Sequence, residues 1–352
     1  MRAVLHLLPH PGGGAETYID LLEELQGYRH DRVHFSPTRS RLRGAPSVIA
    51  RWLGIARRTR AVDLVHAHGD TAAILAAPLL ARSPSLITTH GLHRLRRVTG
   101  ARPTLARRGL RAAVASASRT VCTTRSEREE LAGLLSPELR DRLVVIPNGV
   151  RLVPADDPGR RVRARQALGV ADREVVALYV GVLETRKDPG TAIGAVEEAR
   201  ARGAPLVLVI AGTGPLAPQV SASASEAVRP LGHRDDVADL YAAADLFVLP
   251  SRREGMPIAL LEAMSHGVAP VVSDAPGIGE AVGGAGAIVP AGDQEALSDR
   301  LADLAADPGA RVRLGAAARA RVRDELSEER FLARMQELYD VVARARGSSY
   351  GA

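Results

Sequence analysis

Residues 246–262 read Leu-Phe-Val-Leu-Pro-Ser-Arg-Arg-Glu-Gly-Met-Pro-Ile-Ala-Leu-Leu-Glu. The first four residues form a continuous apolar run, which is typical of a strand buried on both faces of a parallel sheet. A polar loop follows, and Pro257 then suits the first position of a helix that carries Leu260 and Leu261. The segment therefore predicts a strand, a loop and a helix, which is the repeating unit of an α/β protein.

The same unit recurs along the chain. Short runs rich in Val, Ile and Leu alternate with stretches rich in Ala, Arg, Glu and Leu, which read as helices. The runs occupy residues 3–8, 64–67, 86–89, 120–123 and 143–146 in the first half, and 175–180, 206–210, 246–249, 268–272 and 287–289 in the second. This alternation predicts doubly wound parallel sheets.

A break in the pattern divides the chain into two α/β domains. Between Pro147 and Val170 the periodicity stops, and Asn148-Gly149 and Pro158-Gly159 mark turns. We expect two similar α/β domains joined by a linker near residue 150. The expected order is a first domain over 1–150, a linker over 151–170, a second domain over 171–327 and, over 328–352, a helix that docks on the first domain.

Charge is distributed unevenly between the two halves. Residues 1–170 contain 28 Lys+Arg and 14 Asp+Glu, whereas residues 171–352 contain 19 and 26. The arginine-rich segments 39–60 and 93–111 also carry apolar residues, a pattern that suits an anionic membrane surface. Solvated helix faces in an arginine-rich protein are the alternative. No nucleic-acid motif is present and aromatic residues make up only 3%, so we expect no nucleic-acid partner.

The single cysteine, Cys122, excludes an internal disulfide and fits a reducing compartment. No apolar run reaches the length of a membrane span, and no signal peptide is visible. We therefore expect a cytoplasmic protein, either free or bound peripherally to the inner face of the membrane.

Ligands of open α/β sheets bind at the carboxyl ends of strands. Glycines 12–14 follow the first apolar run, and their N–H groups can approach a phosphate, although a tight turn needs the same residues. His90 ends another run before Gly91 and is placed to contact a sugar hydroxyl. For His66 and His68 we expect hydrogen-bonded packing, because no cysteine or carboxylate sits at metal spacing with them.

The second half contains the charged candidates. Lys187 is the only lysine among 47 basic residues, which indicates a site that needs a compact ammonium, such as a phosphate contact. Arg186 precedes it. Glu254 lies just before the helix that starts near Pro257, and Glu262 lies about 7.5 Å further along that helix. The helix N-terminus favours an anion, so a diphosphate between the two carboxylates is our hypothesis.

Together these residues resemble the retaining glycosyltransferases of family 4. The resemblance implies the GT-B fold, in which two Rossmann-like, doubly wound parallel-sheet domains face a cleft. The resemblance extends over nearly the whole chain, and its strongest element is the pair Glu254 and Glu262. The matching stretches are residues 12–16, 65–69, 88–91, 145–150, 181–187, 210–215, 231–234, 245–262, 267–274 and 289–293.

The resemblance implies that the second domain binds a UDP- or GDP-sugar and that the first binds most of a glycan, lipid-linked or small-molecule acceptor. Gly13 and Gly14 would approach the donor diphosphate, which Lys187 would neutralise. His90 would contact the sugar at the reacting end. The family retains the anomeric configuration and usually needs no metal, so we expect neither a metal nor a cofactor beyond the nucleotide sugar as co-substrate.

The resemblance also assigns the residues around the helix start. Glu254 and the backbone from Gly255 through Met256 to Pro257 would hold the sugar hydroxyls, and Glu262 would bind the ribose. His90, Lys187 and Glu254 would be the catalytic residues, and Arg186 would also bind the donor.

One departure keeps alternatives open. The family often has arginine after the glycine at position 181, whereas this chain has Val182, so Arg186 would have to substitute. Two other functions remain to be tested. One is a basic membrane- or nucleic-acid-binding protein with a degenerate transferase site, and the other is a nucleotide-sugar epimerase of the same fold.

Overall fold

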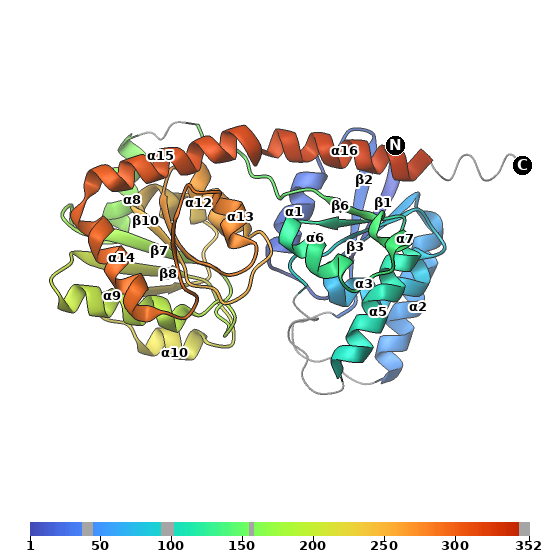
Figure 1. Ribbon diagram of the computed structural model, residues 1–352, viewed down its shortest axis with the longest axis horizontal. Coiled ribbons are helices and arrows are strands. Elements are labelled where there is room, and N and C mark those ends of the chain that lie inside the picture. Colours follow the sequence, from blue (N-terminus) through green and yellow to red (C-terminus); the bar gives the residue numbers. More distant parts are fainter. Residues whose placement is uncertain (37–44, 93–101, 155–157, 345–352) are drawn as a thin grey trace, which may run out of the picture. The chain divides into compact units, whose positions relative to one another are not determined.

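The computed structural model describes residues 1–36, 45–92, 102–154 and 158–344 (Figure 1). The chain forms two compact units. Unit 1 combines Met1–Asn148 with the segment from Glu329 onward, and unit 2 is Gly149–Glu328. Each unit contains a six-stranded parallel sheet flanked by helices, which confirms the predicted α/β class with two doubly wound sheets.

The sheet of unit 1 has the strand order β2-β1-β3-β4-β5-β6. Its strands are β1 (Arg2–Leu8), β2 (Tyr28–His34), β3 (Leu64–His68), β4 (Ser85–Thr88), β5 (Arg119–Cys122) and β6 (Leu143–Val145). The described helices are α1 (Gly14–Leu22), α2 (Ala45–Arg58), α3 (Gly69–Leu80), α5 (Arg102–Ser116), α6 (Arg125–Ala132), α7 (Pro137–Arg140) and α16 (Glu328–Arg344), with a 3-10 turn at Thr59–Ala61.

The sheet of unit 2 has the order β12-β11-β10-β7-β8-β9. Its strands are β7 (Val175–Val180), β8 (Leu206–Ala211), β9 (Val228–Gly232), β10 (Leu246–Leu249), β11 (Ala269–Ser273) and β12 (Ala287–Val289). The helices are α8 (Pro158–Ala167), α9 (Pro189–Ala201), α10 (Ala217–Ala222), α11 (Val237–Ala243), α12 (Ile258–Ser265), α13 (Ile278–Val282), α14 (Gln294–Ala306) and α15 (Pro308–Glu325).

Two strands, β2 and β9, escaped the sequence prediction. Both lie at an edge of a sheet, where one side of the strand is not covered by a neighbour. In β2 only Tyr28 is fully buried, and the remaining six residues are polar or only partly covered. Edge strands are less buried, so they lack the continuous apolar run by which central strands are recognised.

Successive side chains of the strands alternate between the two faces of each sheet. In unit 2 both faces are apolar: Leu178 and Phe247 belong to the core on one face, and Ala177 and Val248 to the core on the other. In unit 1 the two faces differ in composition. Leu5 of β1 belongs to the core with α2, α3 and α5, whereas the opposite face carries buried histidines.

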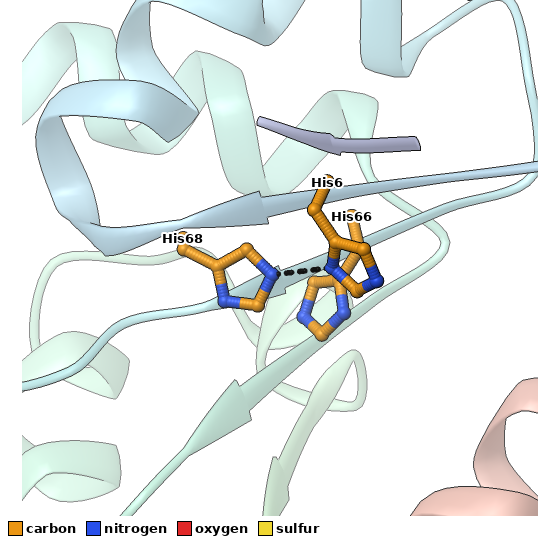
Figure 2. Close-up of side chains that lie close together, drawn as sticks. All are labelled: His6, His66 and His68. Carbon is orange, nitrogen blue, oxygen red and sulfur yellow. Dashed lines mark hydrogen bonds between the residues drawn. The ribbon is translucent and has the colours of Figure 1, made fainter. Parts of the chain in front are cut away.

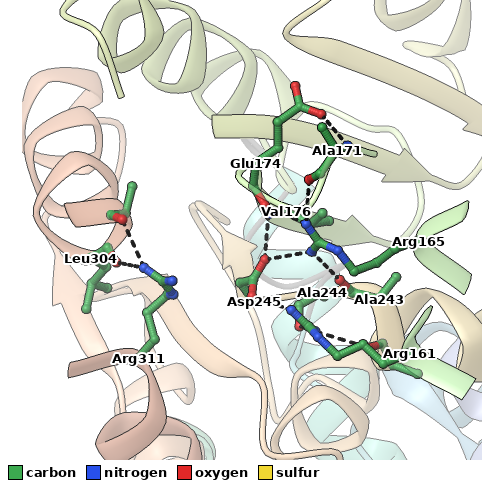
Figure 3. A network of polar contacts seen from close by, with 12 residues as sticks. Arg161, Arg165, Ala171, Glu174, Val176, Ala243, Ala244, Asp245, Leu304 and Arg311 are labelled. Atoms are coloured by element: carbon green, nitrogen blue, oxygen red, sulfur yellow. Dashed lines mark hydrogen bonds and ion pairs between the residues drawn. The ribbon is translucent and has the colours of Figure 1, made fainter. Parts of the chain in front are cut away.

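The prediction of a linker over residues 151–170 is wrong for α8, which packs within unit 2 (Figure 3). Arg165 is buried and donates to Asp245 at 3.1 Å and to the carbonyl of Glu174 at 2.6 Å. Arg161 reaches the second oxygen of Asp245 at 2.6 Å. The guanidinium groups thereby donate hydrogen bonds to carbonyls at strand and helix ends. The polar residues of α8 are therefore held in fixed contacts, and the segment is not a free linker.

Helix α16, red in Figure 1, packs on unit 1. The buried side chains include Phe331, Met335 and Tyr339, which recur at helical spacing. Asp340 of the same helix accepts a hydrogen bond from Tyr28 at 2.7 Å. Within the described parts of the chain, every helix is too short or too polar to cross a bilayer.

Candidate functional site

Two loops of unit 2 bring three predicted residues together. The loop after β7 carries Arg186 and Lys187, and the loop after β10 carries Glu254. The two strands are neighbours in the sheet, so both loops leave from the same edge. The N–H of Arg252 donates to the carbonyl of Arg186 at 2.8 Å, which joins the loops through their backbones.

The carboxylate of Glu254 is 5% exposed and lies between two cations. Its Oε1 is 2.6 Å from Lys187 Nζ, and its Oε2 accepts a hydrogen bond from Arg186 at 3.2 Å. Arg186 also pairs with Glu184 at 2.8 Å. These two positive and two negative charges cancel. A diphosphate here would therefore rely on Lys187 changing partner and on the free N–H groups of a helix start.

Helix α12 begins at Ile258, with Pro257 as the N-cap in an extended conformation. The helix thus starts one residue later than predicted, and Pro257 precedes its first residue. Gly255 is held by Gly277, which has a φ of +87° and no room for a side chain. A Cβ there would lie 1.8 Å from the carbonyl oxygen of Gly255. Met256 is buried in the core, so its backbone, rather than its side chain, lines the loop.

Glu262 has a partner that the sequence did not reveal. Its Oε2 accepts a hydrogen bond from the hydroxyl of Tyr241 at 2.9 Å, and the side chain is partly exposed. Burial raises the pKa of Glu262, and the Tyr241 hydroxyl opposes that shift. Tyr241 comes from α11, 21 residues earlier, and nothing in the local pattern indicates that it faces α12.

The glycine loop of unit 1 connects β1 to α1. Gly12 and Gly13 both have positive φ values, 80° and 98°, which a side chain would disfavour. Gly13 is the N-cap of α1 and Gly14 is its first residue. Glu16 accepts from the N–H of Gly12 at 3.4 Å and pairs with His34 at 2.8 Å. The predicted Gly13 and Gly14 thus lie at a helix N-terminus with a well-supported first turn.

His90 lies two residues after the end of β4, with an unusual φ of 52° for a residue with a side chain. Its Nε2 is 3.1 Å from Nδ1 of His68. Burial lowers the pKa of His90 to about 4, so the ring is neutral at physiological pH. The next residue, Gly91, donates its N–H to Glu127.

Glu127 is a supporting residue that the sequence analysis missed. It is buried, and it also accepts hydrogen bonds from the N–H of Thr123 at 2.6 Å and from its hydroxyl at 3.0 Å. Burial raises the pKa of Glu127 while these hydrogen bonds lower it. Glu127 thus ties the loop of His90 and Gly91 to the start of α6. The Thr-x-x-Glu spacing of Thr124 and Glu127 at that helix start was a signal that could have identified it.

His6, His66 and His68 are the metal-like cluster of the described residues, with ring nitrogens within 4.8 Å of one another (Figure 2). All three are buried. Their nitrogens already have partners: His6 Nδ1 and His68 Nε2 are 2.8 Å apart, and His66 bonds Tyr339 at 2.7 Å and Thr88 at 2.8 Å. A metal would have to displace these bonds, and the hydrogen-bonded packing predicted for His66 and His68 is confirmed.

The predicted residues thus form one group in unit 2, namely Arg186, Lys187 and Glu254, with Glu262 further along α12. Gly13, Gly14 and His90 belong to unit 1. Val182 follows Gly181 at the end of β7, and Arg186 instead places a guanidinium on Glu254. Of the basic segments, residues 39–44 and 93–101 lie outside the described residues.

Two units with parallel six-stranded sheets, and with charged and glycine-rich loops at the strand ends, define the GT-B class. Solved structures of this class match almost the whole chain. HepE of Anabaena in complex with UDP-glucose has a TM-score of 0.81 and 19% identity, over 97% of this chain and 100% of that chain. Sucrose-phosphate synthase from Thermosynechococcus elongatus has a TM-score of 0.80 and 20% identity, over 98% and 100%. Identities this low show the fold alone.

Sequence families agree with that class. The model of Glycosyltransferase Family 4 matches residues 7–153, and that of Glycosyl transferases group 1 matches residues 174–307. The chain belongs to these glycosyltransferases.

Two curated relatives have higher sequence identity to the chain than these solved structures. A D-inositol 3-phosphate glycosyltransferase of Xylanimonas cellulosilytica is 33% identical over 59% of this chain, and the match spans about half of that relative (53%). An alpha-maltose-1-phosphate synthase of Mycolicibacterium smegmatis is 28% identical over 88% of this chain and 87% of the relative.

Proposed function

We propose that this protein transfers a sugar from a UDP- or GDP-sugar to a glycan, lipid-linked or small-molecule acceptor, with retention of configuration and without a metal. The observation that carries the proposal is the ion cluster of Lys187, Arg186 and Glu254 beside the N-terminus of α12. The complex of HepE with UDP-glucose, a protein of the same fold, supports a nucleotide-sugar donor.

In this mechanism the departing diphosphate is stabilised by Lys187, Arg186 and the N–H groups at the start of α12. The Lys187–Glu254 pair holds both groups in place before the donor binds. Phosphate oxygens then compete for Lys187, and sugar hydroxyls compete for Glu254. Glu262, oriented by Tyr241, accepts hydrogen bonds from the ribose. His90 is neutral and contacts the sugar.

Retention follows if the acceptor attacks from the face that the diphosphate leaves, with no covalent sugar–enzyme intermediate. The ammonium of Lys187 lies 2.6 Å from Glu254, which lowers the nucleophilicity of that carboxylate. A sugar–enzyme adduct trapped on Glu254 and detected by mass spectrometry would contradict this step.

The donor can be tested by a thermal-shift screen of UDP- and GDP-sugars with the full chain. A donor at a hundredfold excess over its dissociation constant should stabilise the protein by about 2.7 kcal/mol. The matched test uses the variant Glu262→Gln. It should weaken the binding of every nucleotide sugar, because it removes the carboxylate charge that accepts hydrogen bonds from the ribose. Binding of neither donor class would contradict the proposal.

Product analysis then separates the remaining functions. Transfer should persist in excess EDTA and give a product with the donor's anomeric configuration, read by NMR. Conversion of the donor to its epimer without any acceptor would identify an epimerase instead. Donor binding without transfer or hydrolysis for any acceptor would indicate a degenerate site.

A membrane contact is the second part of the proposal. On α2, Ile49 and Leu53 are 60% and 50% exposed, and exposed arginines such as Arg51 and Arg57 lie on the same helix. On α5, Leu105 is 75% exposed. Exposed apolar residues among arginines favour the interface of an anionic membrane.

Flotation with liposomes tests this contact. We expect co-flotation with vesicles containing phosphatidylserine at low salt, but not with neutral vesicles. The double variant Ile49→Ser and Leu53→Ser should lose most of the binding. Val312→Ser, at a residue of unit 2 that is 71% exposed, should retain it. Absence of co-flotation by the natural protein would contradict the proposed contact.

A further inference from the structure

On the face of the unit 1 sheet opposite Leu5, four histidines follow one another in the order in which the strands lie. His30 belongs to β2, His6 to β1 and His68 to β3, and His90 follows β4. Facing nitrogens are 2.8 Å apart between His30 and His6, 2.8 Å between His6 and His68, and 3.1 Å between His68 and His90. We call these four residues the histidine row. Figure 2 shows its central bond, with His66 to one side.

Aromatic side chains enclose the row. Tyr18 of α1 contacts His68 and His90 edge-on, and Tyr339 of α16 lies against His30. His6 and His68 are fully buried, and burial lowers the pKa of each well below its ordinary value. The row is therefore a chain of neutral imidazoles.

Neutral imidazole has one N–H donor and one acceptor nitrogen. Both nitrogens of His6 and both of His68 are used within the row. A ring that accepts from one neighbour must therefore donate to the next, so all hydrogen bonds of the row point in one direction. The row has only two proton arrangements, and they place the proton of His90 on different nitrogens.

The end of the row at His30 favours one arrangement. Its Nε2 is buried and has no hydrogen-bond partner among the described residues. If the bonds pointed towards His30, this atom would be a buried N–H without an acceptor, which is rarer in proteins than an unpaired acceptor. The bonds therefore point from His30 to His90. Each ring carries its proton on Nδ1, and His90 accepts at Nε2 from His68.

We propose that the histidine row fixes the tautomer of His90, so that His90 offers an Nδ1–H donor to a hydroxyl of the bound sugar. His30, His6 and His68 are positioning residues that act through His90. This inference rests on the proposed role of His90 in binding the donor sugar. Reversal of the row would put a lone pair at Nδ1 of His90 and remove that donor.

A matched pair of substitutions at His30 tests transmission along the row. His30 is partly exposed on an edge strand, so both variants should fold. In His30→Asn the amide can still donate to His6. In His30→Asp, which has the same shape, the carboxylate only accepts and should force His6 to donate from Nε2. The bonds of the row would then reverse, and the proton of His90 would move to Nε2.

The readout is the tautomer of each ring, measured by long-range proton–nitrogen NMR correlation with 15N-labelled histidine at pH 8. The natural protein and His30→Asn should show Nδ1–H rings along the row, and His30→Asp should show His90 as Nε2–H. His66→Gln, at an equally buried histidine outside the row, should leave His90 unchanged. The same tautomer of His90 in His30→Asp and His30→Asn would overturn the proposal, as would mixed directions in the natural protein.

Two further measurements complete the test. Turnover of the donor identified by the thermal-shift screen should fall about tenfold in His30→Asp relative to His30→Asn. If the natural protein binds no nucleotide sugar, the proposed function fails. The NMR result still decides whether the histidine row fixes the tautomer of His90. Elemental analysis of the purified protein comes first. If the natural protein contains one equivalent of zinc and His6→Phe contains none, these rings are metal ligands, and the proposed hydrogen-bonded row is overturned.

Discussion

At the scale of single residues, the site depends on charges that neutralise one another. Glu254 is almost fully buried, and a carboxylate in that position is stable only with partners. Lys187 and Arg186 supply them from a neighbouring loop. The only lysine of the chain thus contacts Glu254, the buried acid of the loop after β10.

Lys187→Met should lower turnover about tenfold or more, because it removes a positive charge from the departing diphosphate. It should also cost up to about 3 kcal/mol of stability, because Glu254 loses its nearer partner in a buried setting. Donor hydrolysis and thermal unfolding measure the two effects. Arg202→Met, which breaks an exposed pair with Asp299, should cost at most about 1 kcal/mol and leave turnover unchanged. Unchanged turnover in Lys187→Met would remove this residue from the mechanism.

At the scale of elements, the loop between β10 and α12 is held by the neighbouring loop between β11 and α13. The segment between β11 and α13 brings Gly277 against the carbonyl of Gly255, so the two loops fit only without a side chain. This close backbone contact positions the loop that leads into α12. The helix N-terminus can then act as a preformed site for an anion.

Gly277→Ala should displace Gly255 and raise the KM for the donor about tenfold, because the new Cβ overlaps the Gly255 carbonyl. The positive φ adds a conformational cost of about 1–2 kcal/mol to folding. Gly279→Ala is the control, because its Cβ meets nothing within 4 Å and it lies inside α13. That variant should be neutral or slightly more stable. Steady-state kinetics and urea unfolding of both variants measure the difference, and an unchanged KM in Gly277→Ala would contradict the proposed loop contact.

At the scale of the whole molecule, the two units have similar architecture but differently composed interiors. Unit 2 has apolar cores on both faces of its sheet, whereas unit 1 has histidines on one face. Buried neutral histidines connect the stability of unit 1 to pH. The unfolded chain takes up protons near pH 6.5, where the buried rings of His6, His66 and His68 do not.

Because these folded-state pKa values are depressed, their contribution to stability is fully present above about pH 6.5 and is lost as the pH falls below it. Each histidine should remove about 1.4 kcal/mol per pH unit in that window. The pKa of Glu127 is raised in the folded protein, so its protonation adds stability as the pH falls and partly offsets the loss of stability caused by the histidines. Urea unfolding followed by the fluorescence of Trp52, the only tryptophan and a residue of unit 1, measures the slope. His66→Gln should reduce it by one histidine's share, and constant stability from pH 7 to 5.5 would contradict the prediction.

The sequence by itself determined the α/β class, most central strands and the start of α12, because burial on both faces of a sheet imposes continuous apolar runs. It also identified the loops in which Lys187, Glu254 and His90 lie. The edge strands β2 and β9 were missed, because partial exposure removes that pattern. The helix α8 was taken for a linker, because its arginines, including the buried Arg165, look like solvated residues in a sequence.

Only the tertiary structure decided which side chains meet. Glu254 contacts Arg186 from 68 residues away, and Tyr241 contacts Glu262 from 21 residues away. The histidine row joins residues of four segments through the order of the strands in the sheet. Local periodicity reports whether a side chain is buried, but its partner depends on strand order and register. Those are set by packing of the whole unit and cannot be read from any single segment.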